Sequence, residues 1–189
     1  MFGTGISGRI ALYSVLAIAA IGGSTGALAQ QKTSRTVVGA FPGAVNEINE
    51  THRDWELNCS VVDIRKLCVL MQTLGDKDTR APILSMEFTP IGPDELKAVL
   101  TFPFSANLGD SVRLSVGTIR GERDLPFQGC DANGCKVIAS IGGEMLRGLQ
   151  ASGSMRISTV SRETGKRIIY PSSLAGFSTA YSRAVTLLQ

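Results

Sequence analysis

The four cysteines of this 189-residue chain limit its possible folds more than any other feature. Cys59 and Cys68 form one close pair in the sequence, and Cys130 and Cys135 form another. Four cysteines allow three disulfide pairings. The local pairing joins each cysteine to its near neighbour, needs the least rearrangement of the chain and suits the turn residues that each pair encloses. In the chain-entropy model, each such short loop stabilises a fold by roughly 2 to 3 kcal/mol.

The N-terminal segment has the three-part layout of a secretory signal peptide. A short region ending at Arg9 precedes a 12-residue apolar run from Ile10 to Ile21, and small residues continue to Ala27-Leu28-Ala29. This layout predicts cleavage between Ala29 and Gln30. A membrane-spanning helix needs about 20 apolar residues, so an uncleaved anchor fits less well. We therefore predict an exported protein with residues 1–29 as signal peptide and no membrane span after cleavage.

Export also decides between the possible uses of the cysteines. An even number of cysteines in an exported chain favours disulfides. Zinc and thioredoxin-type redox sites usually contain C-x-x-C spacing, which is missing here, and His52 is the only histidine of the chain. We therefore expect no metal and no cofactor. We interpret His52 as an exposed loop residue rather than a general base or a ligand.

The remaining 160 of the 189 residues suit a leader and one domain of ordinary size. Residues 30–51 are polar and irregular, which predicts a flexible leader. From Trp55 to Cys59 apolar and polar residues alternate, as in a strand with one buried face. Residues 52–189 are expected to form one disulfide-stapled domain. Further strand-like runs lie between turn signals at residues 67–74, 83–89, 96–102, 111–117, 136–141, 154–161 and 166–170.

Short strands at this spacing, joined by tight turns, predict a mainly β protein with an antiparallel β-sandwich. Two helical segments interrupt the pattern. The first runs from Gly143 to Ala151. The second runs from Ser173 to Leu188, with Pro171 and Ser172 or Ser173 as its start signal. The apolar positions of the two segments are Met145, Leu146 and Leu149 in the first, and Leu174, Phe177, Tyr181, Val185 and Leu188 in the second.

The charges and motifs narrow the range of functions. The formal net charge is +3, and the lysines and arginines are scattered along the sequence. This distribution predicts neither a nucleic-acid groove nor a polybasic membrane patch. The sequence contains neither G-x-S-x-G nor H-E-x-x-H. We therefore predict a protein that is not an enzyme and has no catalytic residues.

The segment from Cys130 to Cys135 is the most distinctive local feature. It encloses the turn residues Asp131-Ala132-Asn133-Gly134, and Asn133-Gly134 tolerates positive φ. The structural interpretation is a stapled hairpin. A rigid exposed loop is also suitable for recognition, and the residues favour the structural interpretation without excluding the other.

Several of these features occur together in the order and spacing of a known family. The matching residues are Trp55, Leu57, Cys59, Cys68, Gln72, Phe102-Pro103-Phe104, Pro126-Phe127-Gln128-Gly129-Cys130, Gly134-Cys135, Ser173-Leu174-Ala175-Gly176-Phe177 and Ala180-Tyr181. In these residues the chain resembles the invasion-associated locus B family of bacterial exported proteins. Arg53 departs from the pattern, since a small residue such as Gly is expected before Asp54-Trp55.

The resemblance implies a periplasmic or outer-envelope-associated protein with an immunoglobulin-like antiparallel β-sandwich. It implies no assigned enzymatic activity and offers no catalytic or ligand residues to carry over. The family takes its name from members linked to bacterial invasion of host cells. The preferred hypothesis is an interaction protein whose unidentified macromolecular partner is an envelope component or a host surface. The alternatives are a periplasmic enzyme or small-ligand-binding protein, which requires a deep pocket with convergent polar groups, and a structural protein of the envelope.

Overall fold

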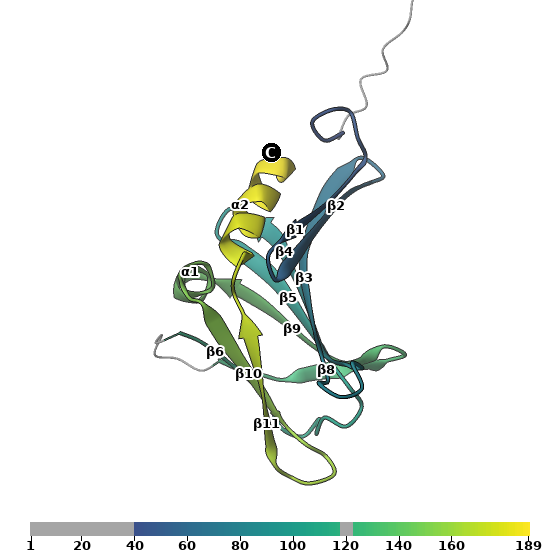
Figure 1. Cartoon of the computed structure of the whole chain (residues 1–189), viewed down its shortest axis with the longest axis vertical. Coiled ribbons are helices and arrows are strands. Elements are labelled where there is room, and N and C mark those ends of the chain that lie inside the picture. The colour runs from purple at the N-terminus through teal and green to yellow at the C-terminus, as the bar shows by residue number, and fades with distance from the viewer. Residues whose placement is uncertain (1–39, 118–122) are drawn as a thin grey trace, which may run out of the picture. The chain divides into compact units, whose positions relative to one another are not determined.

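The computed structural model describes residues 40–117 and 123–189, all of which lie in the compact unit Thr36–Gln189. The predicted signal peptide and its cleavage residues Ala27, Ala29 and Gln30 lie outside the described residues. The described part contains eleven strands in two antiparallel sheets, together with two helices (Figure 1). The predicted mainly β sandwich with two helical segments is therefore confirmed.

The larger sheet begins as a series of antiparallel hairpins. Its first five strands pair in the order in which they occur in the chain, then β9 pairs with β5, and β8 pairs with β9 at the far edge. The strands are β1 (Glu47–His52), β2 (Trp55–Val62), β3 (Arg65–Gly75), β4 (Pro82–Gly92), β5 (Glu95–Phe102), β8 (Phe127–Asp131) and β9 (Gly134–Gly142).

The smaller sheet has the strand order β11-β10-β6-β7. Its members are β6 (Val112–Val116), β7 (Arg123–Leu125), β10 (Ser154–Val160) and β11 (Arg167–Ser173). β10 and β11 form a hairpin, and β10 also pairs with β6. The buried residues of both sheets belong to one hydrophobic core, so the inner faces of the sheets pack against each other.

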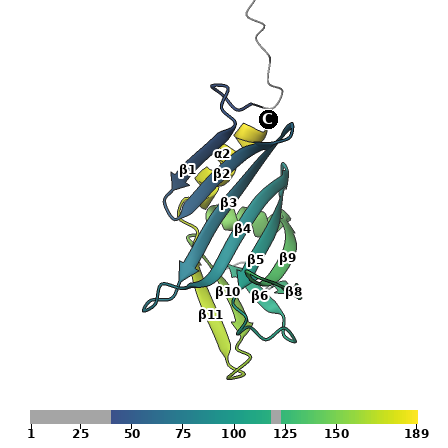
Figure 2. The same ribbon diagram turned by 90° about the vertical axis from the view of Figure 1, so that its right-hand side faces the viewer.

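One face of the larger sheet is covered and the other is open. Burial alternates along β2 to β5, as the period of two requires when only one face packs against the core. Figure 2 shows the open face, with both helices behind the sheet. On the outer face of β3, Leu67 is exposed and Val69 and Met71 are half-buried.

The two helices cover part of the inner face. Helix α1 (Gly143–Ala151) lies near β9, and α2 (Phe177–Leu188) packs across β1 to β4. The predicted apolar residues of α1 are all buried. In α2 the buried positions are Phe177, Ala180, Tyr181, Ala184 and Leu187, whereas Val185 and Leu188 lie at the margin of this face and Leu174 is buried before the helix begins.

The boundary of the predicted leader is wrong over residues 40–51. Residues 47–51 belong to β1, which pairs with β2 from Glu47 opposite Ser60 to His52 opposite Trp55. Phe41 is also buried in the core. The sequence concealed this strand because its polar residues show no apolar alternation. Pairing with β2 satisfies its backbone groups instead.

The start signal of the second helix is also wrong. Pro171, Ser172 and Ser173 end strand β11, and Gly176 is the residue before the first helical position. Gly176 has φ +92°, a left-handed conformation that suits glycine. Pro171 is tolerated in β11 because β11 is an edge strand of the smaller sheet.

Candidate functional site

Phe102 anchors one end of the sandwich. It is the last residue of β5, lies opposite Cys135 of β9, and is fully buried. Its ring packs edge-on against Phe127 of β8, with centroids 5.5 Å apart, and against Tyr170 of β11 at 5.8 Å. These contacts tie both sheets together at this end.

A stapled turn lies beside Phe102. The disulfide between Cys130 and Cys135 joins β8 to β9, and Gly134 within the turn has φ +137°. A Cβ atom on Gly134 would lie 2.3 Å from the carbonyl oxygen of Phe102, so only glycine allows this close approach. Within the turn, the carboxylate of Asp131 accepts the backbone N–H of Asn133 at 2.9 Å.

An ion pair adds to the order of this turn. The ammonium of Lys136 lies 2.5 Å from Oδ2 of Asp131. The hydrogen bond from Lys136, followed by the backbone N–H of Asn133, lowers the pKa of Asp131 below its usual value. The same contact raises the pKa of Lys136. Both groups are therefore charged at neutral pH, and their ion pair links the turn to β9.

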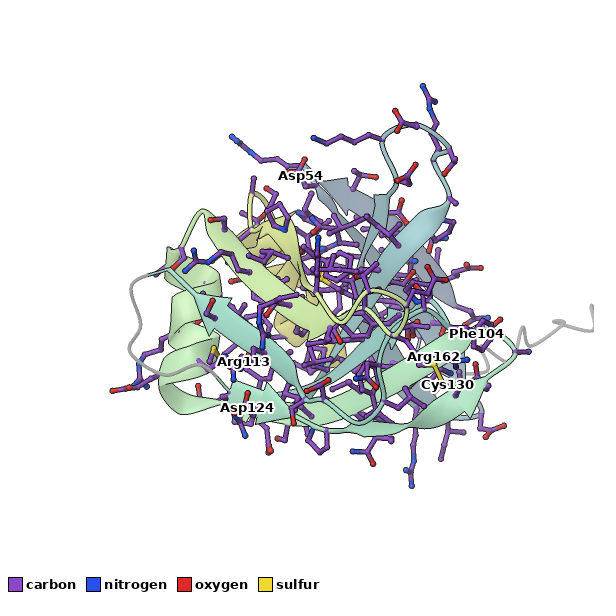
Figure 3. The ribbon with its side chains drawn as sticks, turned by 90° about the horizontal axis from the view of Figure 1, so that it is seen from below. Asp54, Phe104, Arg113, Asp124, Cys130 and Arg162 are labelled. Atoms are coloured by element: carbon purple, nitrogen blue, oxygen red, sulfur yellow. A yellow bond between two sulfur atoms is a disulfide. The ribbon has the colours of Figure 1, made fainter. Side chains whose placement is uncertain are left out.

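The chain after Phe102 crosses from this turn to the smaller sheet. The N–H of Arg162 donates to the carbonyl of Ser105 at 2.8 Å, and the N–H of Asn107 donates to Val160 at 2.8 Å. We call the surface formed by residues 103–107, 131–134 and 161–166 the stapled end. Figure 3 shows Phe104, Arg162 and Cys130 on one side of the molecule.

The stapled end presents an aromatic ring to solvent. Phe104 is 58 % exposed although Phe102, two residues earlier, is buried. Arg162 is exposed and has no ion-pair partner among the described residues. Aromatic rings and guanidinium groups on an ordered base are common anchors of protein interfaces. The arrangement is therefore suited to binding another macromolecule by contact.

A surface hollow lies at another place on the molecule. It has a volume of about 690 Å³ and lies between the β3–β4 loop and β11, with Asp76, Asp78 and Tyr170 among its lining residues. Asp76 has a lowered pKa, chiefly because its carboxylate accepts the backbone N–H of Thr79. The carboxylate is thus used by its own loop. The other polar residues that line the hollow include Thr73, Lys77 and Asp78.

His52 is half-buried and contacts Glu50, so it is not an exposed loop residue. It ends β1, and its Nε2 lies 3.1 Å from Oε2 of Glu50. The other carboxylate oxygen of Glu50 accepts hydrogen bonds from Nε and Nη2 of Arg183 in α2, at 3.0 and 2.9 Å. Arg183 is the main cause of the lowered pKa of Glu50. Across residues 40–117 and 123–189, no group of three or more His, Cys, Asp or Glu residues is placed to hold a metal ion.

Several residues that carry the family resemblance meet where α2 begins. The indole Nε1 of Trp55 donates to the carbonyl of Ser173 at 3.0 Å. The amide Nε2 of Gln72 donates to the same carbonyl at 3.1 Å and to the carbonyl of Asp54 at 2.9 Å. The Trp55 ring packs edge-on against Phe177 at 5.0 Å. These contacts hold the helix to the sheet, so the role of these residues is structural.

The turn before β2 tolerates the departure at Arg53. Arg53 has φ +55° in the two-residue turn between β1 and β2, where glycine would adopt this conformation without strain. The backbone N–H of Asp54 in the same turn donates to the carbonyl of Ala175 at 3.2 Å. The departure therefore leaves the turn and its contact with the α2 region intact.

The predicted site residues divide between the interior and the surface. Cys59 and Cys68 form a buried disulfide between facing positions of β2 and β3, whereas Cys130 is exposed in the stapled end. This is the local pairing. The sequence did not single out Phe104 and Arg162 as binding residues. The available signal for Phe104 was an aromatic residue that follows a strand and a proline in a polar loop.

Comparisons with known proteins agree with this architecture. An Invasion protein B homolog of Brucella abortus (strain 2308) is 24 % identical over 148 residues, which cover 78 % of this chain and 85 % of the relative. Invasion protein B of Bartonella bacilliformis is 24 % identical over 152 residues, covering 79 % and 81 % of the two chains. The crystal structure of invasion associated protein B from Bartonella henselae superposes with a TM-score of 0.68, at 21 % identity, over 74 % of this chain and 96 % of that one.

The superposition on the crystal structure shows that the fold is shared. A family profile shows that the sequence is similar as well. The profile described as Invasion associated locus B (IalB) protein matches residues 55–185, from the start of β2 into α2. This range includes all four cysteines and the contacts that hold α2 to the sheet. The chain belongs to the Invasion associated locus B (IalB) family.

Proposed function

We propose that this chain is an exported, non-enzymatic interaction protein of the bacterial periplasm or outer envelope. Two disulfides support export, because disulfides persist mainly in oxidising compartments outside the cytoplasm. In the described part of the chain, neither helix is long and apolar enough to cross a membrane. The relatives are named invasion proteins, which supports a partner on a host surface or in the envelope.

The observation that carries the proposal is the exposed ring of Phe104 on the stapled end. The ring is 58 % exposed, although burial of a phenyl ring is favourable by roughly 1.5 to 3 kcal/mol. The neighbouring backbone is fixed by the Cys130–Cys135 disulfide and by the hydrogen bond between Arg162 and Ser105. A partner that covers Phe104 would gain this burial with little loss of conformational entropy.

The test is a binding titration with a matched surface variant. Labelled protein with intact disulfides is titrated onto isolated outer membranes of the producing bacterium and, separately, onto host-cell membranes. We expect saturable binding to one of them, and Phe104→Ser should weaken it by roughly thirtyfold, as for loss of an anchor residue of about 2 kcal/mol. Ile91→Ser removes a side chain that is 54 % exposed near the end of β4. This control should leave binding within about twofold of the wild type.

Two outcomes would contradict the proposal in different ways. Equal binding of the Phe104→Ser and wild-type proteins would show that the interface lies elsewhere. Binding no stronger than that of a reduced and unfolded control, to both membranes, would exclude the interaction function itself. Circular dichroism and thermal unfolding of each variant separate a loss of contact from a loss of fold.

A further inference from the structure

The outer face of the smaller sheet gathers positive charge that is scattered in the sequence. Arg113 of β6, Arg156 of β10 and Arg167 of β11 line one hollow of about 160 Å³, together with Ser115, Ser158 and Ile169. These six residues form what we call the arginine hollow. The even distribution of basic residues along the chain suggested no such cluster. Strand pairing brings the three arginines onto one face.

The register of the sheet places Ser158 at the centre of the hollow. Arg113 lies directly opposite Ser158 on one side, and Ile169 lies opposite on the other. Arg156 is two residues away on the same strand, so its side chain points to the same face. Arg167 lies opposite Val160, and its Nη1 donates to Oγ of Ser158 at 3.1 Å. The three arginines therefore lie on one face around Ser158, and the guanidinium of Arg167 contacts its hydroxyl.

Among the residues that the structure describes, few acidic groups face the arginines of this sheet. Nε of Arg113 donates to Oδ1 of Asp124 at 3.1 Å, and Figure 3 shows this pair away from Phe104 and Arg162. Among the described outward positions of the four strands of this sheet, Asp124 is the only acidic residue. Neither Arg156 nor Arg167 has an ion-pair partner in the described ranges. Like charges at neighbouring sheet positions are destabilising, and a bound anion would relieve this repulsion.

The shape of the donors indicates the type of anion. A guanidinium group offers parallel N–H donors that match two oxygens of a phosphate, and several such groups can share one tetrahedral anion. Ser115 and Ser158 add hydroxyl donors. The hollow is too small for a drug-sized ligand, whose pockets have volumes of about 300 to 1,000 Å³. It fits one compact group, and Ile169, which is 57 % exposed, supplies an apolar contact at its margin.

We infer that the arginine hollow is a binding site for a phosphate monoester group, held by Arg156 and Arg167 together with Arg113. The carrier of this phosphate is a lipid headgroup or a soluble sugar phosphate, and Ile169 contacts the carrier. The site lies on the outer face of the smaller sheet and involves neither Phe104 nor Arg162. It therefore stands whether or not the stapled end binds a partner.

The first experiment is a titration of the isotope-labelled protein with inorganic phosphate at constant ionic strength, followed through the side-chain N–H signals of the arginines. We expect saturable shifts for Arg156 and Arg167. The double variant Arg156→Gln/Arg167→Gln should weaken binding about tenfold or more, because it removes charge-assisted hydrogen bonds. The control Arg65→Gln/Arg147→Gln removes two exposed arginines elsewhere and should change affinity less than about twofold.

The second experiment identifies the carrier. Phosphatidylcholine vesicles with and without phosphatidic acid are compared in a sedimentation assay, and glucose 1-phosphate is added as a competitor. Binding that depends on phosphatidic acid indicates a lipid headgroup, whereas phosphate binding without vesicle binding indicates a soluble carrier.

The absence of saturable shifts with inorganic phosphate, or an equal loss of affinity in the two double variants, would overturn the inference. The variant Arg156→Lys/Arg167→Lys retains the charge, and wild-type affinity in it would overturn the role of the guanidinium groups.

Discussion

Substitution of Gly176 by alanine should destabilise the packing of helix α2 against the sheet. Gly176 has φ +92°, and a Cβ atom at this position would lie 1.8 Å from the carbonyl oxygen of His52 and 2.6 Å from its carbonyl carbon. Both atoms belong to the backbone, so no side-chain rotation can relieve the overlap. The turn between β1 and β2 must therefore move away from the start of α2.

The structure gives the size of the effect. The left-handed conformation costs an alanine about 1 to 2 kcal/mol. The movement also strains the hydrogen bonds that the carbonyl of Ser173 accepts from Trp55 and Gln72, and the bond from Asp54 to Ala175. A hydrogen bond contributes about 1 kcal/mol. We expect Gly176→Ala to lower the free energy of unfolding by about 3 to 4 kcal/mol, a large part of the roughly 5 to 15 kcal/mol of an ordinary domain.

The assay is urea unfolding followed by the fluorescence of Trp55, the only tryptophan of the chain. Gly165→Ala is the matched control, because Gly165 has φ +67° and no atom within 4 Å of the added Cβ. Only the conformational cost applies there, so the control should lose about 1 kcal/mol. If the two variants differ by less than about 1 kcal/mol, the close approach of Gly176 to His52 is not a constraint on the fold.

Three further predictions concern pH and redox conditions. Arg183 lowers the pKa of Glu50 below its usual value of 4.5. The Glu50–Arg183 ion pair therefore stabilises the fold above pH 4.5, and this stabilisation is lost as the pH falls through the lowered pKa. Glu50→Gln should lower the thermal midpoint at pH 7 by at most a few degrees and have less effect near pH 3. Burial raises the pKa of Tyr170 above 10.0, so its absorbance change in an alkaline titration should come late, and its contribution to stability should fall as the pH rises above about 10. Cys130 is exposed, whereas Cys135 and both cysteines of the β2–β3 disulfide are buried. Mild reduction followed by alkylation and mass spectrometry should therefore label Cys130 first, and earlier labelling of Cys59 or Cys68 would contradict this order.

The sequence predicted those elements whose local pattern agrees with their place in the fold. The strands from Trp55 onward alternate apolar and polar residues, and the structure buries the apolar set. The segment Gly143–Ala151 matches α1 at both ends. In these elements the apolar periodicity of the sequence matches the secondary structure that the fold requires, so tertiary contacts did not have to overrule the local preference.

The missed elements depend on contacts that are distant in the sequence. β1 has one apolar residue on a mostly polar strand and is fixed by pairing with β2 and by the Glu50–Arg183 ion pair. β7 is only three residues long and pairs with β6. Helix α2 begins where Gly176 packs closely against the backbone of His52. No local propensity of these segments contains this information.

The candidate sites were hidden for a related reason. Arg113 is distant in the sequence from Arg156 and Arg167, and only the register of β6, β10 and β11 shows that the three share a face. Phe104 looks like Phe102 in the sequence, because both belong to one short aromatic motif. Burial alone distinguishes the residue that packs from the residue that faces solvent.

This distinction shows where the function of the family member should be sought. Trp55, Gln72 and Phe177 take part in the resemblance, but they hold α2 to the sheet, and their replacement would damage the fold before it tested any interaction. Phe104 takes part in the same resemblance, yet the sandwich gains little from a ring that is more than half exposed. A residue without a structural role can be changed without unfolding the protein. The binding of Phe104→Ser therefore reports on recognition more directly than any substitution in the core.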